Sequence, residues 1–157
     1  MSVKSRYSKY FGFVLGVIIL DVAIKYAVER YLVREFALGF FRIGNYQNPQ
    51  GLFGLVGITE IILISIIVFG AIAFLIWKSE NERERVSLFL IISGGALNLF
   101  ERITMGFVKD NFAIGNLGYF NFADVVIGVG ILLMLFELIK KRKGRTSKER
   151  SDLHWRT

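Results

Sequence analysis

Residues 61–77 read IILISIIVFGAIAFLIW and contain no charged side chain, with Glu60 on one side and Lys78 on the other. Roughly 20 mostly apolar residues cross the hydrocarbon core of a bilayer as a helix, because a helix pairs its backbone polar groups internally. The whole chain of 157 residues is 54% hydrophobic, with a mean hydropathy of +0.50. This composition is too apolar for a soluble domain of that length. The sequence therefore predicts an integral membrane protein.

Three more segments fit membrane spans, at about 10–28, 86–105 and 122–138. The first interrupts its apolar run with Asp21 and Lys25, and no small-x-small cleavage site follows it, so we expect a retained helix and not a cleaved signal peptide. The predicted fold class is an all-α membrane protein, a four-transmembrane-helix bundle with a small β-rich cradle outside the membrane. Residues 1–139 form one integral membrane domain, and residues 140–157 form a basic cytoplasmic tail.

Lys and Arg residues set the predicted orientation. The N-terminus, the 78–85 loop and the tail together contain 14 of them, whereas the two opposite stretches and adjoining helix ends contain five. Cytoplasmic loops are rich in these residues, so both termini are expected in the cytoplasm. The net charge of +7 is thus interpreted as a topology signal, with no nucleic-acid partner. The tail is expected to be disordered and attracted to anionic headgroups.

Two stretches then lie on the outer side, 29–59 and about 106–121. The segment EFALGFFRIGNYQ (35–47) is rich in aromatic and β-branched residues with partial alternation. We expect short strands there, resting on the membrane surface, followed by an interfacial segment around 51–59. The alternative is a flexible loop with a few aromatic anchors.

The residue types exclude several chemistries. The chain has no cysteine, and its single histidine, His154, lies in the charged tail. Zinc, haem, thiolate and Ser-His catalysis are therefore not expected, and the site is predicted to need no metal or cofactor.

Ionisable residues in or beside the spans are costly, so they mark a protein interior or a watery cavity. Asp21 and Lys25 are spaced i, i+4 on one helix face and predict a structural ion pair. Glu101 and Arg102 are adjacent and point in different directions, so each needs its own partner. Arg102 suits the positioning of a carboxylate or a peptide carbonyl.

Asp110 and Asp124 flank the second outer stretch, at the end of the third span and the start of the fourth. Antiparallel neighbouring helices could bring them together. Two carboxylates that share a site do not both ionise easily, so one holds a proton while the other activates water. This pair predicts peptide hydrolysis without metal or nucleophile. Helix caps or surface charges are the plain alternative for two such aspartates.

Four motifs in order resemble the lipoprotein signal peptidase family (signal peptidase II). They are LDVAIK (20–25), NPQGLFG (48–54), GGALNLFERITMGFVKD (94–110) and FNFAD (120–124). The resemblance covers nearly the whole chain except the tail, and the last two motifs are the most specific. It implies an intramembrane aspartyl endopeptidase in the bacterial cytoplasmic membrane, acting as a monomer, with the active site at the outer face.

The resemblance also implies roles for single residues. Asp110 and Asp124 match the catalytic pair; the positions that line the site and hold substrate are Asn48, Asn98, Arg102 and Asn121; and the positions that support the fold are Asp21, Lys25 and Glu101. The implied substrate is a prolipoprotein whose cysteine carries a diacylglyceryl group, with cleavage on the amino side of that cysteine. Membrane lipids are the other expected partners.

The chain departs from the family pattern at three positions. Gln50 and Leu97 stand where the family normally has glycine, and Glu101 stands where it has aspartate. The stretch between the two aspartates is also a few residues shorter. These changes point to altered substrate preference more than to altered chemistry. Two rival functions remain at this stage, a small transporter or channel subunit and an inactive homologue that binds lipid or peptide.

Overall fold

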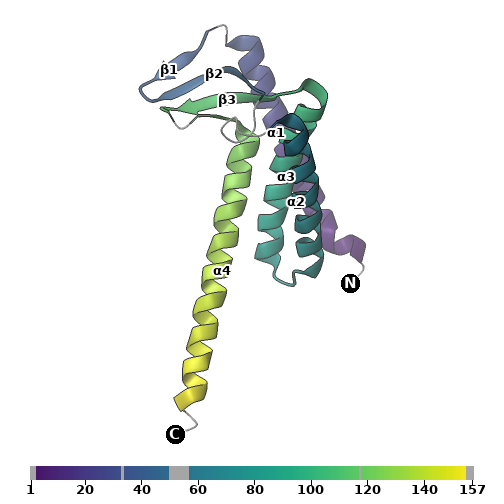
Figure 1. Ribbon diagram of the computed structural model, residues 1–157, viewed down its shortest axis with the longest axis vertical. Coiled ribbons are helices and arrows are strands. Elements are labelled where there is room, and N and C mark those ends of the chain that lie inside the picture. Colours follow the sequence, from purple (N-terminus) through teal and green to yellow (C-terminus); the bar gives the residue numbers. More distant parts are fainter. Residues whose placement is uncertain (1–2, 33, 50–56, 117, 155–157) are drawn as a thin grey trace.

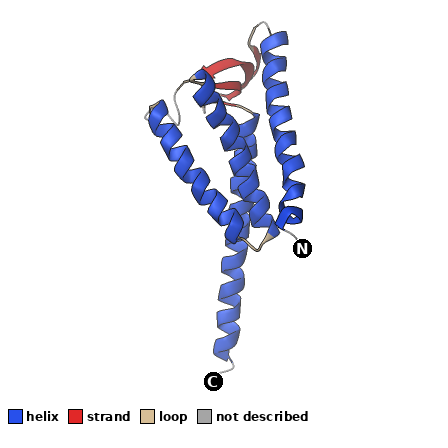
Figure 2. Ribbon diagram, turned by 90° about the vertical axis from the view of Figure 1, so that its right-hand side faces the viewer, coloured by secondary structure: helices blue, strands red, loops and turns tan. Residues whose placement is uncertain are grey.

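Four long helices form a bundle, and a small sheet covers one end of it. The computed structural model describes residues 3–32, 34–49, 57–116 and 118–154. The helices are α1 (Val3–Tyr31), α2 (Ile58–Lys78), α3 (Glu82–Met105) and α4 (Phe122–His154). The two described ends of the chain lie on the side of the bundle opposite the sheet (Figure 1, Figure 2).

All four predicted spans are confirmed. Each helix of the described chain contains a segment long and apolar enough to cross a membrane: Tyr10–Tyr31, Thr59–Lys78, Glu82–Met105 and Phe122–Lys143. Large apolar side chains such as Ile67 and Leu132 are about 70% exposed on the outside of the bundle, where lipid would cover them.

The sheet has four antiparallel strands in the order β1-β2-β3-β4. They are β1 (Phe36–Leu38), β2 (Phe41–Asn48), β3 (Val108–Ile114) and β4 (Tyr119–Phe120). The strands expected in 35–47 are therefore present. The second outer stretch, for which no strand was specifically predicted, supplies β3 and β4. Most of the expected interfacial segment, residues 51–56, lies outside the described residues.

Aromatic side chains and a bulge shape this sheet. The Phe112 ring stacks on Phe41 of β2 and packs against Phe120 of β4, which ties three strands together. The pairing of β2 with β3 shifts register between Ile43 and Tyr46. Such a bulge changes the direction of the side chains that follow it, which here belong to the end of β2 next to the bundle.

The tail differs from expectation. It was predicted to be disordered, but α4 continues without a break to His154 and projects beyond the other helices (Figure 1, Figure 2). Lys, Arg and Glu are good helix formers, and extending an existing helix requires no new nucleation. The charge pattern that suggested disorder is therefore equally compatible with a solvated helical extension.

Two glycines allow α3 and α4 to pack closely. A Cβ placed on Gly94 would lie 2.5 Å from the Ala123 carbonyl oxygen, and one on Gly130 would lie 2.8 Å from the Ser87 carbonyl oxygen. Small residues at such crossings compensate for the absence of a strong hydrophobic force between helices in lipid. Leu97, which stands where the family normally has glycine, packs against the buried cluster of Val17, Leu90 and Val126.

Replacing Gly130 with alanine tests this contact. The new methyl group would meet backbone of α3, so Gly130→Ala should lower the free energy of unfolding by about 1–3 kcal/mol. Gly128→Ala is the matched control, because nothing lies within 4 Å of a Cβ there. Thermal unfolding in detergent, followed by circular dichroism, measures both. Equal midpoints for the two variants would contradict close packing at Gly130.

Candidate active site

The two aspartates meet where the sheet joins the bundle. Helix α3 ends at Met105, and its C-cap is Gly106, whose φ of 81° is a left-handed conformation that suits glycine. The chain turns there into β3. This turn puts Asp110 in the middle of β3, buried to 1% exposure. Asp124 lies in the first turn of α4, just after β4. Strand β3 and the start of α4 therefore bring together two aspartates that lie 14 positions apart in the sequence.

Asn121 links the two carboxylates directly. Its Nδ2 donates to Asp110 Oδ1 at 2.9 Å, and its backbone N–H donates to Asp124 Oδ2 at 3.0 Å. In return, its Oδ1 accepts from the Asp124 backbone N–H at 2.9 Å. Asn121 is completely buried, so its amide is held in one orientation by these bonds.

Two further asparagines complete the network. Asn98 of α3 donates from Nδ2 to Asp124 Oδ1 at 2.7 Å, and its Oδ1 accepts from Asn121 Nδ2 at 3.0 Å. Asn48 of β2 donates from Nδ2 to Asp110 Oδ2 at 3.0 Å. Each carboxylate therefore accepts hydrogen bonds from side chains that come from distant parts of the chain. The three predicted asparagines are all brought together with the two aspartates.

The environment favours the protonated form of Asp110. Burial is the largest cause and raises the pKa of Asp110 to about 6 from 3.8, although the hydrogen bond from Asn48 opposes it. The negative charge of Asp124 raises the pKa further. The Asp110 carboxyl group therefore keeps its proton to a higher pH than an ordinary aspartate does.

The ammonium of Lys25 lies between two carboxylates, and each of them holds the backbone beside one of the two aspartates. It pairs with Asp21 Oδ2 at 2.7 Å and with Glu101 Oε1 at 2.9 Å. The other oxygen of Asp21 accepts from the Ala123 backbone N–H at 3.0 Å, and the other oxygen of Glu101 accepts from the Lys109 backbone N–H at 3.0 Å. Ala123 directly precedes Asp124, and Lys109 directly precedes Asp110. One buried cation thus ties together the backbones that carry the two carboxylates.

The predicted i, i+4 pair of Asp21 and Lys25 is present, and Glu101 has its own partners as expected. Arg102 differs. Its buried Nε has no hydrogen-bond partner among the described residues, the two aspartates included. Gln50 lies outside the described part of the chain. The role assigned to Arg102 therefore stays a prediction.

One contact beside the site was not predicted. Lys109 Nζ pairs with Glu29 Oε2 at 2.6 Å, which joins the end of α1 to β3 one residue before Asp110. The sequence held a signal for it, since Asp21, Lys25 and Glu29 repeat every four residues on one helix face. Among the described residues, no group of three or more His, Cys, Asp or Glu side chains could hold a metal ion.

Comparisons with known proteins decide the family. The sequence model of the family described as signal peptidase (SPase) II matches residues 13–140. The chain belongs to the signal peptidase II family. Lipoprotein signal peptidase of Caldicellulosiruptor bescii is 30% identical over 137 residues, covering 84% of this chain and 91% of that protein. The Borreliella afzelii enzyme of the same name is 31% identical over 166 residues, covering 91% and 98%.

Solved structures share the fold. A bacterial membrane enzyme structure determined by the in meso method at 2.3 Å resolution superposes with a TM-score of 0.77 at 23% identity, covering 87% of this chain and 90% of that one. A second, at 1.9 Å resolution, gives a TM-score of 0.75 at 24% identity. As a signal peptidase II family member, the chain is a peptidase and a multi-pass bacterial membrane protein. This membership does not favour the transporter or channel alternative.

Removing the central cation should destabilise this signal peptidase II fold strongly. Lys25→Met leaves two carboxylates unpaired in a site where Asp21 is 2% exposed, so the free energy of unfolding should fall by about 3–5 kcal/mol. Lys109→Met makes the same substitution at an ion pair with the half-exposed Glu29, and should cost about 0–1 kcal/mol. Denaturant titration in detergent measures both. Similar losses of unfolding free energy in both variants would show that the buried ion pairs of Lys25 stabilise the fold no more than the exposed ion pair of Lys109.

The coupling of the carboxyl groups predicts a pKa change. Asp124→Asn removes a negative charge, which makes ionisation of Asp110 easier, so the pKa of Asp110 should fall from about 6. It should stay above 3.8, because burial remains. The pH dependence of the Asp110 carboxyl carbon signal in NMR measures this value, with Asp152→Asn in the tail as control. An unchanged pKa of Asp110 in Asp124→Asn would contradict the coupling.

Proposed function

We propose that the chain is an aspartic endopeptidase that removes signal peptides from diacylglyceryl-modified prolipoproteins, cleaving on the amino side of the lipidated cysteine. The relatives named above are lipoprotein signal peptidases, which supports the substrate class. The single observation that carries the aspartic mechanism is the shared asparagine. Asp110 and Asp124 both hydrogen-bond to Asn121, so both carboxylates can reach one peptide bond.

The reaction needs only these two carboxyl groups and a water molecule. The ionised carboxylate takes a proton from the water molecule, and the water oxygen adds to the scissile carbonyl carbon. The protonated partner gives its proton to the leaving amine nitrogen, and the carbon–nitrogen bond breaks. The raised pKa of Asp110 favours its protonated form, which the proton donor in this scheme requires. No metal or cofactor enters this scheme.

The surrounding side chains have positioning roles in this proposal. Asn48, Asn98 and Asn121 hold the two carboxylates. The amide hydrogens that Asn48 and Asn98 do not use in these bonds can bind the extended substrate backbone, whereas Asn121 is completely buried with both amide hydrogens engaged. The partly exposed guanidinium of Arg102 is the group proposed to bind a substrate carbonyl. The ion pairs of Lys25 with Asp21 and Glu101 support the fold beside the dyad.

The dyad lies at the sheet end of the bundle, away from both described ends of the chain (Figure 1). With the Lys- and Arg-rich ends in the cytoplasm, the dyad faces the outer side of the membrane. The substrate's lipid can then enter from the outer leaflet between helices. Both aspartates come from one chain, which supports a monomer. Residues 1–139 form the peptidase domain, and the basic continuation of α4 belongs to the cytoplasmic side.

Cleavage assays test the proposal. Purified protein in detergent should release the signal peptide from a diacylglyceryl-modified prolipoprotein, seen as a gel shift. Asp110→Asn and Asp124→Asn should each reduce the rate by roughly 10²–10⁴-fold or more, since each removes one proton-transfer group. Asp152→Asn is the matched control, because Asp152 lies in the tail.

The same assay separates the alternatives. A prolipoprotein whose cysteine carries no diacylglyceryl group should not be cleaved at a comparable rate. Normal cleavage by either folded active-site variant would show that the dyad is assigned wrongly. A folded wild-type chain that cleaves no lipidated prolipoprotein would instead support an inactive homologue.

A further inference from the structure

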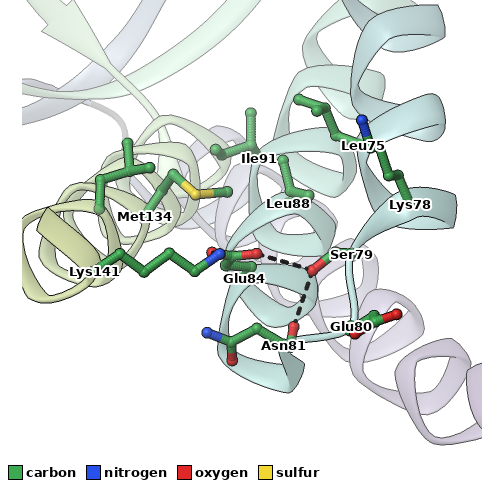
Figure 3. A pocket seen from close by; sticks show the side chains of 11 residues that line it. Leu75, Lys78, Ser79, Glu80, Asn81, Glu84, Leu88, Ile91, Met134 and Lys141 are labelled. Carbon is green, nitrogen blue, oxygen red and sulfur yellow. Dashed lines mark hydrogen bonds and ion pairs between the residues drawn. The ribbon is translucent and has the colours of Figure 1, made fainter. Parts of the chain in front are cut away.

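A cavity of about 1000 Å³ lies at the end of the bundle opposite the proposed active site. Helix α3 packs against both α2 and α4, and the cavity lies over α3 between these two neighbours (Figure 3). This volume is at the upper end of known ligand sites, roughly 300–1,000 Å³. The peptidase mechanism uses none of its residues. They are Leu75, Lys78, Ser79, Glu80, Asn81, Glu84, Leu88, Ile91, Met134, Leu138 and Lys141.

The inner part of the cavity is apolar. Leu88 belongs to a buried hydrophobic cluster, against which Ile91 and Met134 also pack. Leu75 and Leu138 are about half exposed, on α2 and α4 respectively. All five lie in segments apolar enough to span the membrane, so this part of the cavity is at the depth of acyl chains. An acyl chain is the occupant that such a surface selects.

The rim is polar and contains charges of both signs. The Glu84 carboxylate pairs with Lys141 and accepts a hydrogen bond from the Ser79 hydroxyl at 3.1 Å. These groups, from the α2–α3 connection, α3 and α4, satisfy one another (Figure 3). On the α2 side, the Lys78 ammonium and the Glu80 carboxylate have no hydrogen-bond or ion-pair partner among the described residues. The rim thus offers one free cation and one free anion within the described structure.

We propose that this cavity binds one phospholipid whose headgroup contains a phosphate and a primary ammonium. The phosphate pairs with Lys78 and the ammonium with Glu80, while an acyl chain lies over Leu88 and Ile91. Such a headgroup gives both Lys78 and Glu80 a partner of opposite charge.

Other common headgroups fit less well. A phosphatidylglycerol headgroup brings no cation for Glu80. The quaternary ammonium of phosphatidylcholine cannot donate a hydrogen bond, and such groups are recognised by aromatic side chains, which this lining lacks. The charge pattern therefore separates phosphatidylethanolamine from both.

Native mass spectrometry of the full chain in detergent tests the site, with phosphatidylethanolamine, phosphatidylglycerol and phosphatidylcholine of identical acyl chains added separately. One phosphatidylethanolamine should bind roughly fivefold or more tightly than either other lipid. Lys78→Ala and Glu80→Gln should each abolish this preference. Lys140→Ala is the charge-matched control, because exposed Lys140 lies on α4 outside the cavity lining.

A second pair of variants tests the acyl-chain part. Leu138→Trp fills the cavity from its wall and should reduce retained phosphatidylethanolamine at least about fivefold, whereas Ile139→Trp, at the adjacent exposed position, should not. Equal binding of all three lipids, or equal loss in variant and control, would show ordinary annular lipid and overturn the proposal. A preference for phosphatidylglycerol that Glu80→Gln leaves unchanged would overturn the headgroup assignment.

Discussion

The ammonium of Lys25 is the interaction on which the rest of the site depends. It is 5% exposed and lies between the carboxylates of Asp21 and Glu101. Burying three charges would be costly for each alone, and their mutual attraction and shared hydrogen bonds offset that cost. Each carboxylate uses its second oxygen to hold a backbone N–H from another element, at Ala123 and at Lys109. One cation thereby joins α1, α3, β3 and the start of α4.

This arrangement explains how a lipid-facing bundle can hold a polar reaction centre. Helix association in lipid relies on close contact and on polar bonds between helices. At Gly94 and Gly130 the backbones of α3 and α4 come close together. At the sheet end the contact changes to hydrogen bonds among Asn98, Asn121 and Asp124. The packed glycines set the distance between the helices, and the asparagines use that distance to orient the carboxylates.

Local sequence pattern predicted much of this, and long-range pairing limited the rest. The apolar run 61–77 and its counterparts predicted the spans, and the four-residue spacing of Asp21 and Lys25 predicted their ion pair. No local pattern shows that Lys25 also meets Glu101, 76 positions away, because that contact depends on how α1 and α3 pack. The resemblance to signal peptidase II predicted that Asn121 lines the site. Its bonds to both aspartates came only from the structure.

The most direct test of the positioning claim is single-turnover cleavage of a lipidated prolipoprotein by Lys25→Met, at a temperature where the variant is folded. Displacing catalytic groups by about 1 Å can cost roughly 10²-fold in rate. We expect a loss of that order for Lys25→Met and nearly normal cleavage for Lys109→Met, because the latter keeps the backbone N–H of residue 109. Cleavage at the wild-type rate by folded Lys25→Met would show that the two aspartates hold their positions without the shared cation.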